Sequence, residues 1–190
     1  MFSGKKNGEI INTPQKINLF RDLDVKQISL SAKCSALVTS EGDLYVSGLN
    51  TGKRLSFSTT ITKNQEIFRE FTKVSENIID IKIGPYHSII WLSNGTILNV
   101  DNGKITQVKI PNSSSVELNL IRTTKNKDTS KINFGIAVTK ENSIIKWPIR
   151  EVNQVDANVN FYNEKDLEID FVDLALGKNH VIIAYNYQAK

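Results

Sequence analysis

The chain has 190 residues, with 24 Lys or Arg and 20 Asp or Glu, so its formal net charge is only +4 and does not single out a nucleic-acid binder. Hydrophobic residues make up 39% and charged residues 23%, which excludes a disordered or collagen-like chain and predicts a globular one. The longest apolar stretches are far shorter than the ~18 residues of a membrane span, and the first residues show no cleavable signal. One cysteine, Cys34, excludes an internal disulfide, so we expect an intracellular protein, without distinguishing nucleus, cytosol and mitochondrion.

A strand pattern recurs along the chain. The chain contains 24 Ile and 20 Asn but only 7 Ala, so β-branched residues and turn formers are common and the best helix former is scarce. Short apolar segments that each end at a small residue lie at 25–31, 78–84 and 171–177. Each is followed two residues later by a second apolar segment, and these lie at 34–38, 87–91 and 180–184, with a further match at 134–138. The repetition predicts pairs of short β-strands.

Turn residues follow these second segments at a regular spacing. Gly42 and Gly95 tolerate the positive φ that a tight hairpin requires, and Asn142 takes this place in the third copy. Another β-rich segment comes after each turn. The distance is 53 residues from Gly42 to Gly95 and 47 from Gly95 to Asn142. Common propeller blades repeat every ~40 to 50 residues, so this spacing is typical of a blade.

The repeat therefore predicts an all-β fold, a β-propeller of four-stranded antiparallel blades of about 50 residues each. Four short strands cannot bury both faces of a sheet alone, so the units must stack side by side around an axis. A β-sandwich also has short strands and frequent turns and is the alternative. The matching register over three repeats favours the propeller.

The repeats divide the chain, as a single propeller segment, into three complete units between two half-blades. We expect a trailing half-blade at 1–24, repeats at 25–77, 78–120 and 121–170, and a leading half-blade at 171–190. If the two halves paired, they would close a ring of four blades, within the roughly four to eight blades of propellers. The preferred interpretation is a part of a larger propeller, because an unclosed segment has unpaired edges that another segment would complete.

The repeated glycines and histidines resemble a known family. Gly84 and His87, and again Gly177 and His180, form a Gly-x-x-His element that is similar to the blade motif of the regulator-of-chromosome-condensation repeat family. The resemblance touches nearly the whole chain. It implies blades in which these positions, together with the turn glycines, are structural.

Other positions fit the same family pattern or depart from it. Gly42 and Gly95 occupy its turn glycine, and Trp147 lies where the family has a strand tryptophan. Cys34 and Phe134, however, stand where the family has its histidine. The match is therefore a divergent one, carried by recurrence in one register.

No set of residues predicts chemistry. His87 and His180 occupy the same position of the repeat, so a shared architectural role, with the imidazole tying a turn to a neighbouring strand inside a blade, is favoured over catalysis. Cys34 lies on an apolar strand without a paired Cys-His motif, which favours a small buried side chain over a nucleophile. We find no catalytic residues, no cofactor-binding motif and no metal ligands at a supporting spacing, and we expect no cofactor.

A basic insertion distinguishes the third unit. Residues 122–131 carry four basic residues and one acidic residue with no large apolar group, so we expect an exposed loop. Its candidate partner-binding residues are Arg122, Lys125, Lys127 and Lys131. Such a cluster can meet phosphates, an acidic protein surface or an anionic membrane. Nucleic acid is a less favoured partner, because aromatic residues for base stacking are absent.

These features favour a non-enzymatic protein-interaction scaffold or assembly factor. The resemblance implies, as alternatives, guanine-nucleotide exchange on a Ran-like or other small GTPase, or a mitochondrial assembly factor. The expected partner is thus a protein, either a small GTPase or a subunit of a larger assembly. A second propeller segment could complete the ring.

Overall fold

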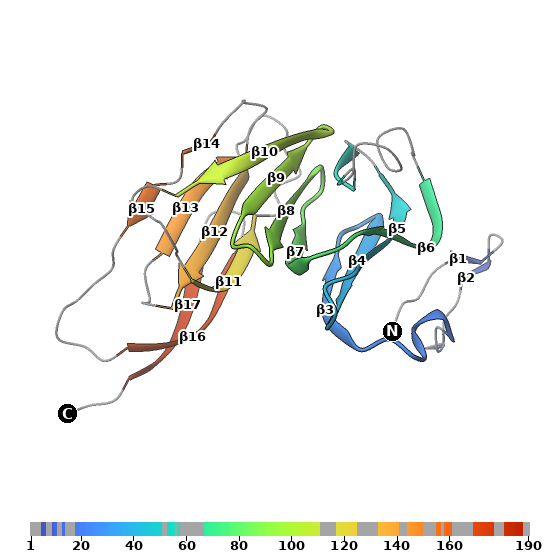
Figure 1. The fold of residues 1–190 in the computed structure, drawn as a ribbon, viewed down its shortest axis with the longest axis horizontal. Helices are drawn as coiled ribbons and strands as arrows, with labels where there is room; N and C mark the ends of the chain where they lie inside the picture. Colours follow the sequence, from blue (N-terminus) through green and yellow to red (C-terminus); the bar gives the residue numbers. More distant parts are fainter. Residues whose placement is uncertain are drawn as a thin grey trace.

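The described part of the computed structural model is all-β, with a short 3-10 helix at Asn18–Phe20 (Figure 1). The structure describes residues 5–6, 9–10, 13, 18–50, 53–55, 57, 67–110, 117–124, 133–140, 144–149, 155–156, 158–160, 169–176 and 181–187. Within them, β-strands follow one another along the chain and pair mostly antiparallel. This confirms the predicted fold class.

The first sheet is a four-stranded antiparallel blade in sequence order. Its strands are β3 (Val25–Leu30), β4 (Cys34–Thr39), β5 (Leu44–Leu49) and β6 (Ile67–Ser75). The turn between β4 and β5 contains Gly42 with a φ of 86°, a conformation that favours glycine. Gly95, with a φ of 83°, has the same role in the next sheet.

The second sheet repeats this order and gains one further strand. Its antiparallel strands are β7 (Ile78–Ile83), β8 (His87–Leu92), β9 (Ile97–Asp101) and β10 (Lys104–Lys109). β14 (Val155–Asp156) then pairs with β10 in parallel. The repeat pattern does not predict this fifth strand, which comes from far along the chain and links the second sheet to the third.

The third sheet contains β11 (Leu118–Thr123), β12 (Asn133–Thr139), β13 (Ile144–Ile149) and β15 (Asn158–Asn160). Two smaller sheets lie toward the ends of the chain. β1 (Lys5–Lys6) pairs with β2 (Glu9–Ile10), and β16 (Ile169–Leu176) pairs with β17 (Val181–Tyr187).

The three larger sheets and the β16–β17 sheet stand side by side like the blades of a propeller. Their first strands are neighbours, since β3 contacts β7, β7 contacts β11 and β11 contacts β16. Figure 1 shows the two ends of the chain at opposite ends of this row. Among the described strands, β1 and β2 pair with each other and β16 pairs with β17, so terminal strands do not close a four-blade ring here.

Two of the predicted unit boundaries fall inside strands. The boundary at 120/121 lies within β11, and that at 170/171 lies within β16. β11 starts at Leu118, where the polar Asn119 and a β-bulge between Leu118 and Leu120 interrupt the apolar pattern. The division into units otherwise stays a prediction.

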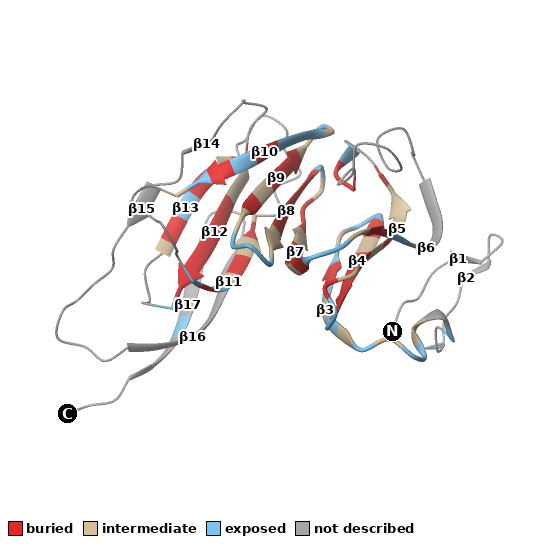
Figure 2. Ribbon diagram, viewed as in Figure 1, coloured by how far each residue is buried: buried red, intermediate tan, exposed pale blue. Residues whose placement is uncertain are grey.

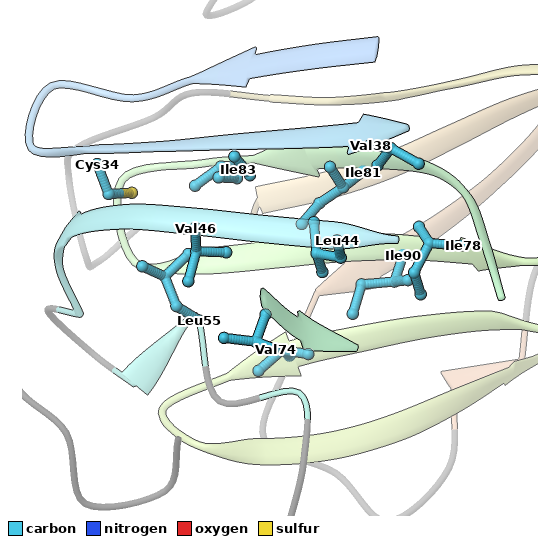
Figure 3. Packing of buried hydrophobic residues seen from close by; sticks show 12 residues of the cluster. Cys34, Val38, Leu44, Val46, Leu55, Val74, Ile78, Ile81, Ile83 and Ile90 are labelled. Atoms are coloured by element: carbon cyan, nitrogen blue, oxygen red, sulfur yellow. The ribbon is translucent and has the colours of Figure 1, made fainter. Parts of the chain in front are cut away.

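The core lies between the blades. One buried cluster joins β4 and β5 of the first blade to β7 and β8 of the second, and Figure 3 shows its side chains. A second cluster joins the second blade to the third, and a third lies on β11, β12 and β13. Figure 2 shows the buried residues concentrated on the inner strands, with exposed positions on β3 and on the outer strand β10. Each blade is therefore held by its neighbours.

Candidate functional site

The basic insertion leaves the fold at the junction between the second and third blades. Thr124 follows β11 and donates its backbone N–H to the Phe134 carbonyl at 3.0 Å. Phe134 N–H donates in return to Thr124 Oγ1 at 2.9 Å, and that hydroxyl donates to Asn133 Oδ1 at 3.0 Å. The two described ends of the insertion are thus fastened together by backbone and side-chain hydrogen bonds.

His87, the first residue of β8, links the second blade to the described ends of the insertion, which we call its base. Its side chain is buried, and Nε2 lies 2.6 Å from Thr123 Oγ1, the last residue of β11. Burial, and secondarily the charge of Arg54, lowers the pKa of His87 to about 4, so the imidazole is neutral at neutral pH. We expected a bond inside one blade, whereas this bond crosses to the next blade.

Gly84 gives the His87 ring its space. A Cβ built on Gly84 would lie 2.2 Å from His87 Cε1, a distance that no real side chain tolerates. Gly84 N–H also donates to the His87 carbonyl at 2.9 Å. The Gly-x-x-His spacing therefore has a steric reason here. The matching Gly177 and His180 lie outside the described residues.

A buried arginine, whose charge acts on His87, was not predicted from the sequence. Arg54 is 2% exposed; its Nε–H donates to Cys34 Sγ at 3.1 Å and its Nη2 to the Leu49 carbonyl at 3.2 Å. Ser88 Oγ donates to the Arg54 carbonyl at 2.7 Å, which ties the loop to the second blade. Burial raises the pKa of Cys34 more than Arg54 lowers it, so the thiol stays protonated and is a poor nucleophile.

The structure places Arg122 in β11 rather than in an exposed loop. Its side chain is half-buried, and Nη1 donates to the Ile121 carbonyl at 3.0 Å. Burial raises the pKa of nearby Asp80, although Lys82 pairs with that carboxylate at 2.8 Å and Arg122 adds a weaker favourable charge. Thr123 is buried as well, because its side chain faces the second blade. Lys125, Lys127 and Lys131 lie outside the described residues.

Trp147 makes the second polar link between these blades. The indole is completely buried, and Nε1–H donates to Asn99 Oδ1 of β9 at 2.9 Å. A Cβ built on Gly135 would lie 2.2 Å from Trp147 Cε2, so β12 needs glycine beside the ring. The sequence placed Trp147 on a strand but gave no partner for it.

A groove of about 820 Å³ opens between the second and third blades, at the end where β8 turns into β9. Trp91 lines it, and the Trp91 indole N–H is buried without an acceptor among the described residues. An ion pair between Lys140 and Glu117 lies at its rim. The groove thus has a mixed apolar, polar and charged lining.

Two features are absent from the described part of the chain. No three His, Cys, Asp or Glu side chains come together as metal ligands there. No helix in that part is long and apolar enough to cross a membrane.

No protein-family model matches the sequence, and no curated protein matches it either. Solved structures do match the fold. Human WBSCR16 aligns with a TM-score of 0.60 at 13% identity, over 86% of this chain and 45% of that protein. Yeast RCC1 (Prp20), solved with Kap60 bound, gives 0.57 at 9% identity, over 93% of this chain and 44% of that protein. The fold is that of an RCC1-type β-propeller.

A second structure of Prp20p, from Saccharomyces cerevisiae, aligns with a TM-score of 0.58 at 14% identity, over 88% of this chain and 43% of that protein. The report of that structure also describes the binding of Prp20p to Gsp1p and histones. The chain spans less than half the length of each of these RCC1-type proteins. The predicted resemblance and the predicted partial propeller are confirmed.

Proposed function

We propose that this RCC1-type segment is a non-enzymatic protein-interaction scaffold, and that the basic insertion binds an acidic surface of a protein partner. The observation that carries the proposal is the fastening of the insertion. Thr123 ties its base to the buried His87, and Thr124 joins the two described ends by accepting the Phe134 N–H. A loop held at both ends on a packed scaffold loses less entropy on binding than a free one.

Charge supplies the second argument. Lys125, Lys127 and Lys131 follow within a few residues of that base. Arg122 already donates to a carbonyl and contributes to the field around Asp80, so the three lysines are the better candidates for partner contact. A cluster of one sign speeds association with an oppositely charged surface and makes the association depend on salt.

The test is affinity isolation from native lysate with a charge-matched pair of variants. The first variant changes Lys125, Lys127 and Lys131 to Ser. The control changes three exposed lysines elsewhere, Lys33, Lys104 and Lys109, to Ser. Both lower the net charge equally, so we expect the first to lose a partner that the control and the wild type retain. Equal loss from both variants, or retention by both, overturns the assignment of the loop.

Guanine-nucleotide exchange is the alternative, because the structural neighbour Prp20p is a protein studied for its binding to Gsp1p. Release of a fluorescent guanine nucleotide from a Ran-type GTPase, with and without this chain, separates the two functions. The scaffold predicts an unchanged release rate. Faster release, together with tight binding of the nucleotide-free GTPase, would favour exchange instead.

A further inference from the structure

The groove between the second and third blades is bounded by segments from both of them. Its lining includes the turn from β8 to β9, the end of β10, the start of β11 and the residue that follows β12, and every lining residue is described. Its volume of about 820 Å³ lies within the roughly 300–1,000 Å³ of ligand-binding sites. β11 runs from Leu118 at the groove to Thr123 at the base of the insertion, so the groove and the insertion lie at opposite ends of one strand.

Trp91 departs from the repeat at this groove. The register of the first two strands of each blade places Trp91 where the first and third blades have Val38 and Val138. Both valines are completely buried, whereas the larger Trp91 is half-buried and lines the groove. Its indole N–H has no acceptor among the described residues, so a hydrogen bond there does not explain the tryptophan. The second blade thus keeps a large, partly exposed ring where the other two blades complete their cores.

Ile79 departs from the repeat at the same place. The first strand of each of the three blades contains a β-bulge, and the extra residues at these bulges are Lys26, Ile79 and Asn119. Lys26 and Asn119 are polar and exposed, whereas Ile79 is half-buried and lines the groove. A β-bulge changes the direction in which a side chain points, and the two other blades show that this position accepts a polar residue. The fold therefore does not require the isoleucine.

The apolar floor of the groove is supported by the core. Trp91 and Ile110 pack on the buried cluster that joins the second and third blades, and both also line the groove together with Ile79. Side chains that are already held by packing lose little conformational freedom when an apolar group covers them. The floor is therefore suited to bind apolar side chains.

The charged side chains of the lining have a net positive charge. Lys109 is exposed and makes no ion pair with a described residue. The other two charged lining residues, Lys140 and Glu117, pair with each other, and their side chains are 59% and 65% exposed. Such an exposed pair is weak and adds no net charge. A carboxylate that accompanies apolar groups therefore complements the groove.

We propose that this groove binds a short extended segment of a partner protein in which apolar side chains stand beside carboxylates. The apolar side chains lie on Ile79, Trp91 and Ile110, and a carboxylate lies at Lys109. A peptide presents apolar side chains together with polar backbone groups, which suits this mixed lining better than a small apolar ligand does. The inference does not depend on the basic insertion, which lies at the other end of β11.

Selection from a display library of short random peptides tests the chemistry of the occupant. The lysines of the insertion also attract acidic peptides, so the bait is the full chain carrying Lys125→Ser, Lys127→Ser and Lys131→Ser. We expect the selected peptides to be enriched in large apolar residues together with Asp or Glu. Enrichment of basic peptides, or no enrichment, overturns this proposal and leaves that for the insertion untouched.

Fluorescence anisotropy with a selected, dye-labelled peptide tests the site. Ile79→Asn copies the polar residue of the third blade, and Lys109→Glu reverses the charge of the rim, so each should weaken binding about tenfold or more. Lys26→Glu, at an exposed lysine of the first blade that does not line the groove, should bind as the wild type does. Circular dichroism checks that all three variants fold. Unchanged binding to either groove variant, or equal weakening in Lys26→Glu, overturns the proposal.

Tryptophan emission provides a readout that belongs to the groove. The chain has two tryptophans, and Trp147 is completely buried. Binding of the peptide should therefore shift the emission of Trp91 to shorter wavelength, and in Trp91→Phe the emission should stay unchanged when the peptide is added. A peptide that binds the wild type without changing its emission would place the binding elsewhere and overturn the assignment to the groove.

Discussion

His87 Nε2 and Thr123 Oγ1 lie 2.6 Å apart and join the second blade to the third at the base of the basic insertion. At the preceding junction the same two positions hold Cys34 and Ile83, which belong to one apolar cluster. The fold thus uses an apolar pair at one junction and a hydrogen-bonded pair at the next. The histidine is an architectural residue whose partner lies 36 residues away.

We predict that Thr123→Ile destabilises the chain and that His87→Cys partly reverses the loss. The single change leaves the buried imidazole without its partner, which costs about 1–3 kcal/mol. The double variant recreates the apolar pair of the first junction. Urea unfolding gives the free energy of unfolding of each variant. If the loss in the double variant equals the sum of the losses in the two single variants, this account is contradicted.

Acid should weaken the fold through His87. The unfolded chain takes up a proton near pH 6.5 and the folded chain only near pH 4, so the neutral imidazole contributes stability that is complete above pH 6.5 and lost as the pH falls to about 4. His87→Gln removes this contribution. The difference between the unfolding free energies of wild type and variant should shrink by about 3 kcal/mol over that interval. The raised pKa of Asp80 affects both proteins alike, and a constant difference would refute the role of His87.

Gly135→Ala should be far more harmful than Gly95→Ala. At Gly135 the new methyl would overlap the Trp147 indole, which is buried and hydrogen-bonded, so we expect a loss of about 3 kcal/mol or more. At Gly95 nothing lies within 4 Å, and the cost is the positive φ alone, about 1 kcal/mol. Thermal unfolding of both variants measures the contrast. Equal losses would show that the packing at Trp147 is looser than described.

The two tryptophans provide another matched pair. Trp147→Phe removes the hydrogen bond to Asn99, which is buried and whose Nδ2 already has no partner among the described residues. Trp91→Phe removes an indole N–H that has no acceptor there. The first substitution should therefore cost at least about 1 kcal/mol more than the second. Chemical unfolding measures the free energy of unfolding of both variants. A larger loss for Trp91→Phe would contradict the claim that the Trp147 indole makes the stabilising hydrogen bond.

The local features of the fold were predictable from the sequence. Strand alternation and turn glycines act within a few residues, so the segments at 25–31, 34–38, 78–84 and 87–91 and the turns at Gly42 and Gly95 lie where expected. The resemblance to RCC1-type repeats depended on the same local signals.

Long-range contacts could not be predicted in this way. The parallel pairing of β14 with β10 joins segments that no repeat relates, and Arg54 lies in a connection without a motif. Arg122 was expected in an exposed loop because its neighbours are polar, yet β11 extends through Thr123, which fills an apolar register position. The partner of His87 depends on how two blades pack, which periodicity does not encode.

Hydrogen exchange of backbone amides tests most directly the claim that each blade is held by packing against its neighbours. β3 and β7 are equivalent first strands, and β7 contacts both β3 and β11. Ile81 and Ile83 of β7 are completely buried, whereas Ile28 and Leu30 of β3 are about half exposed. We predict that the amides of β7 exchange more slowly than those of β3. Exchange in β7 as fast as in β3 would contradict the account.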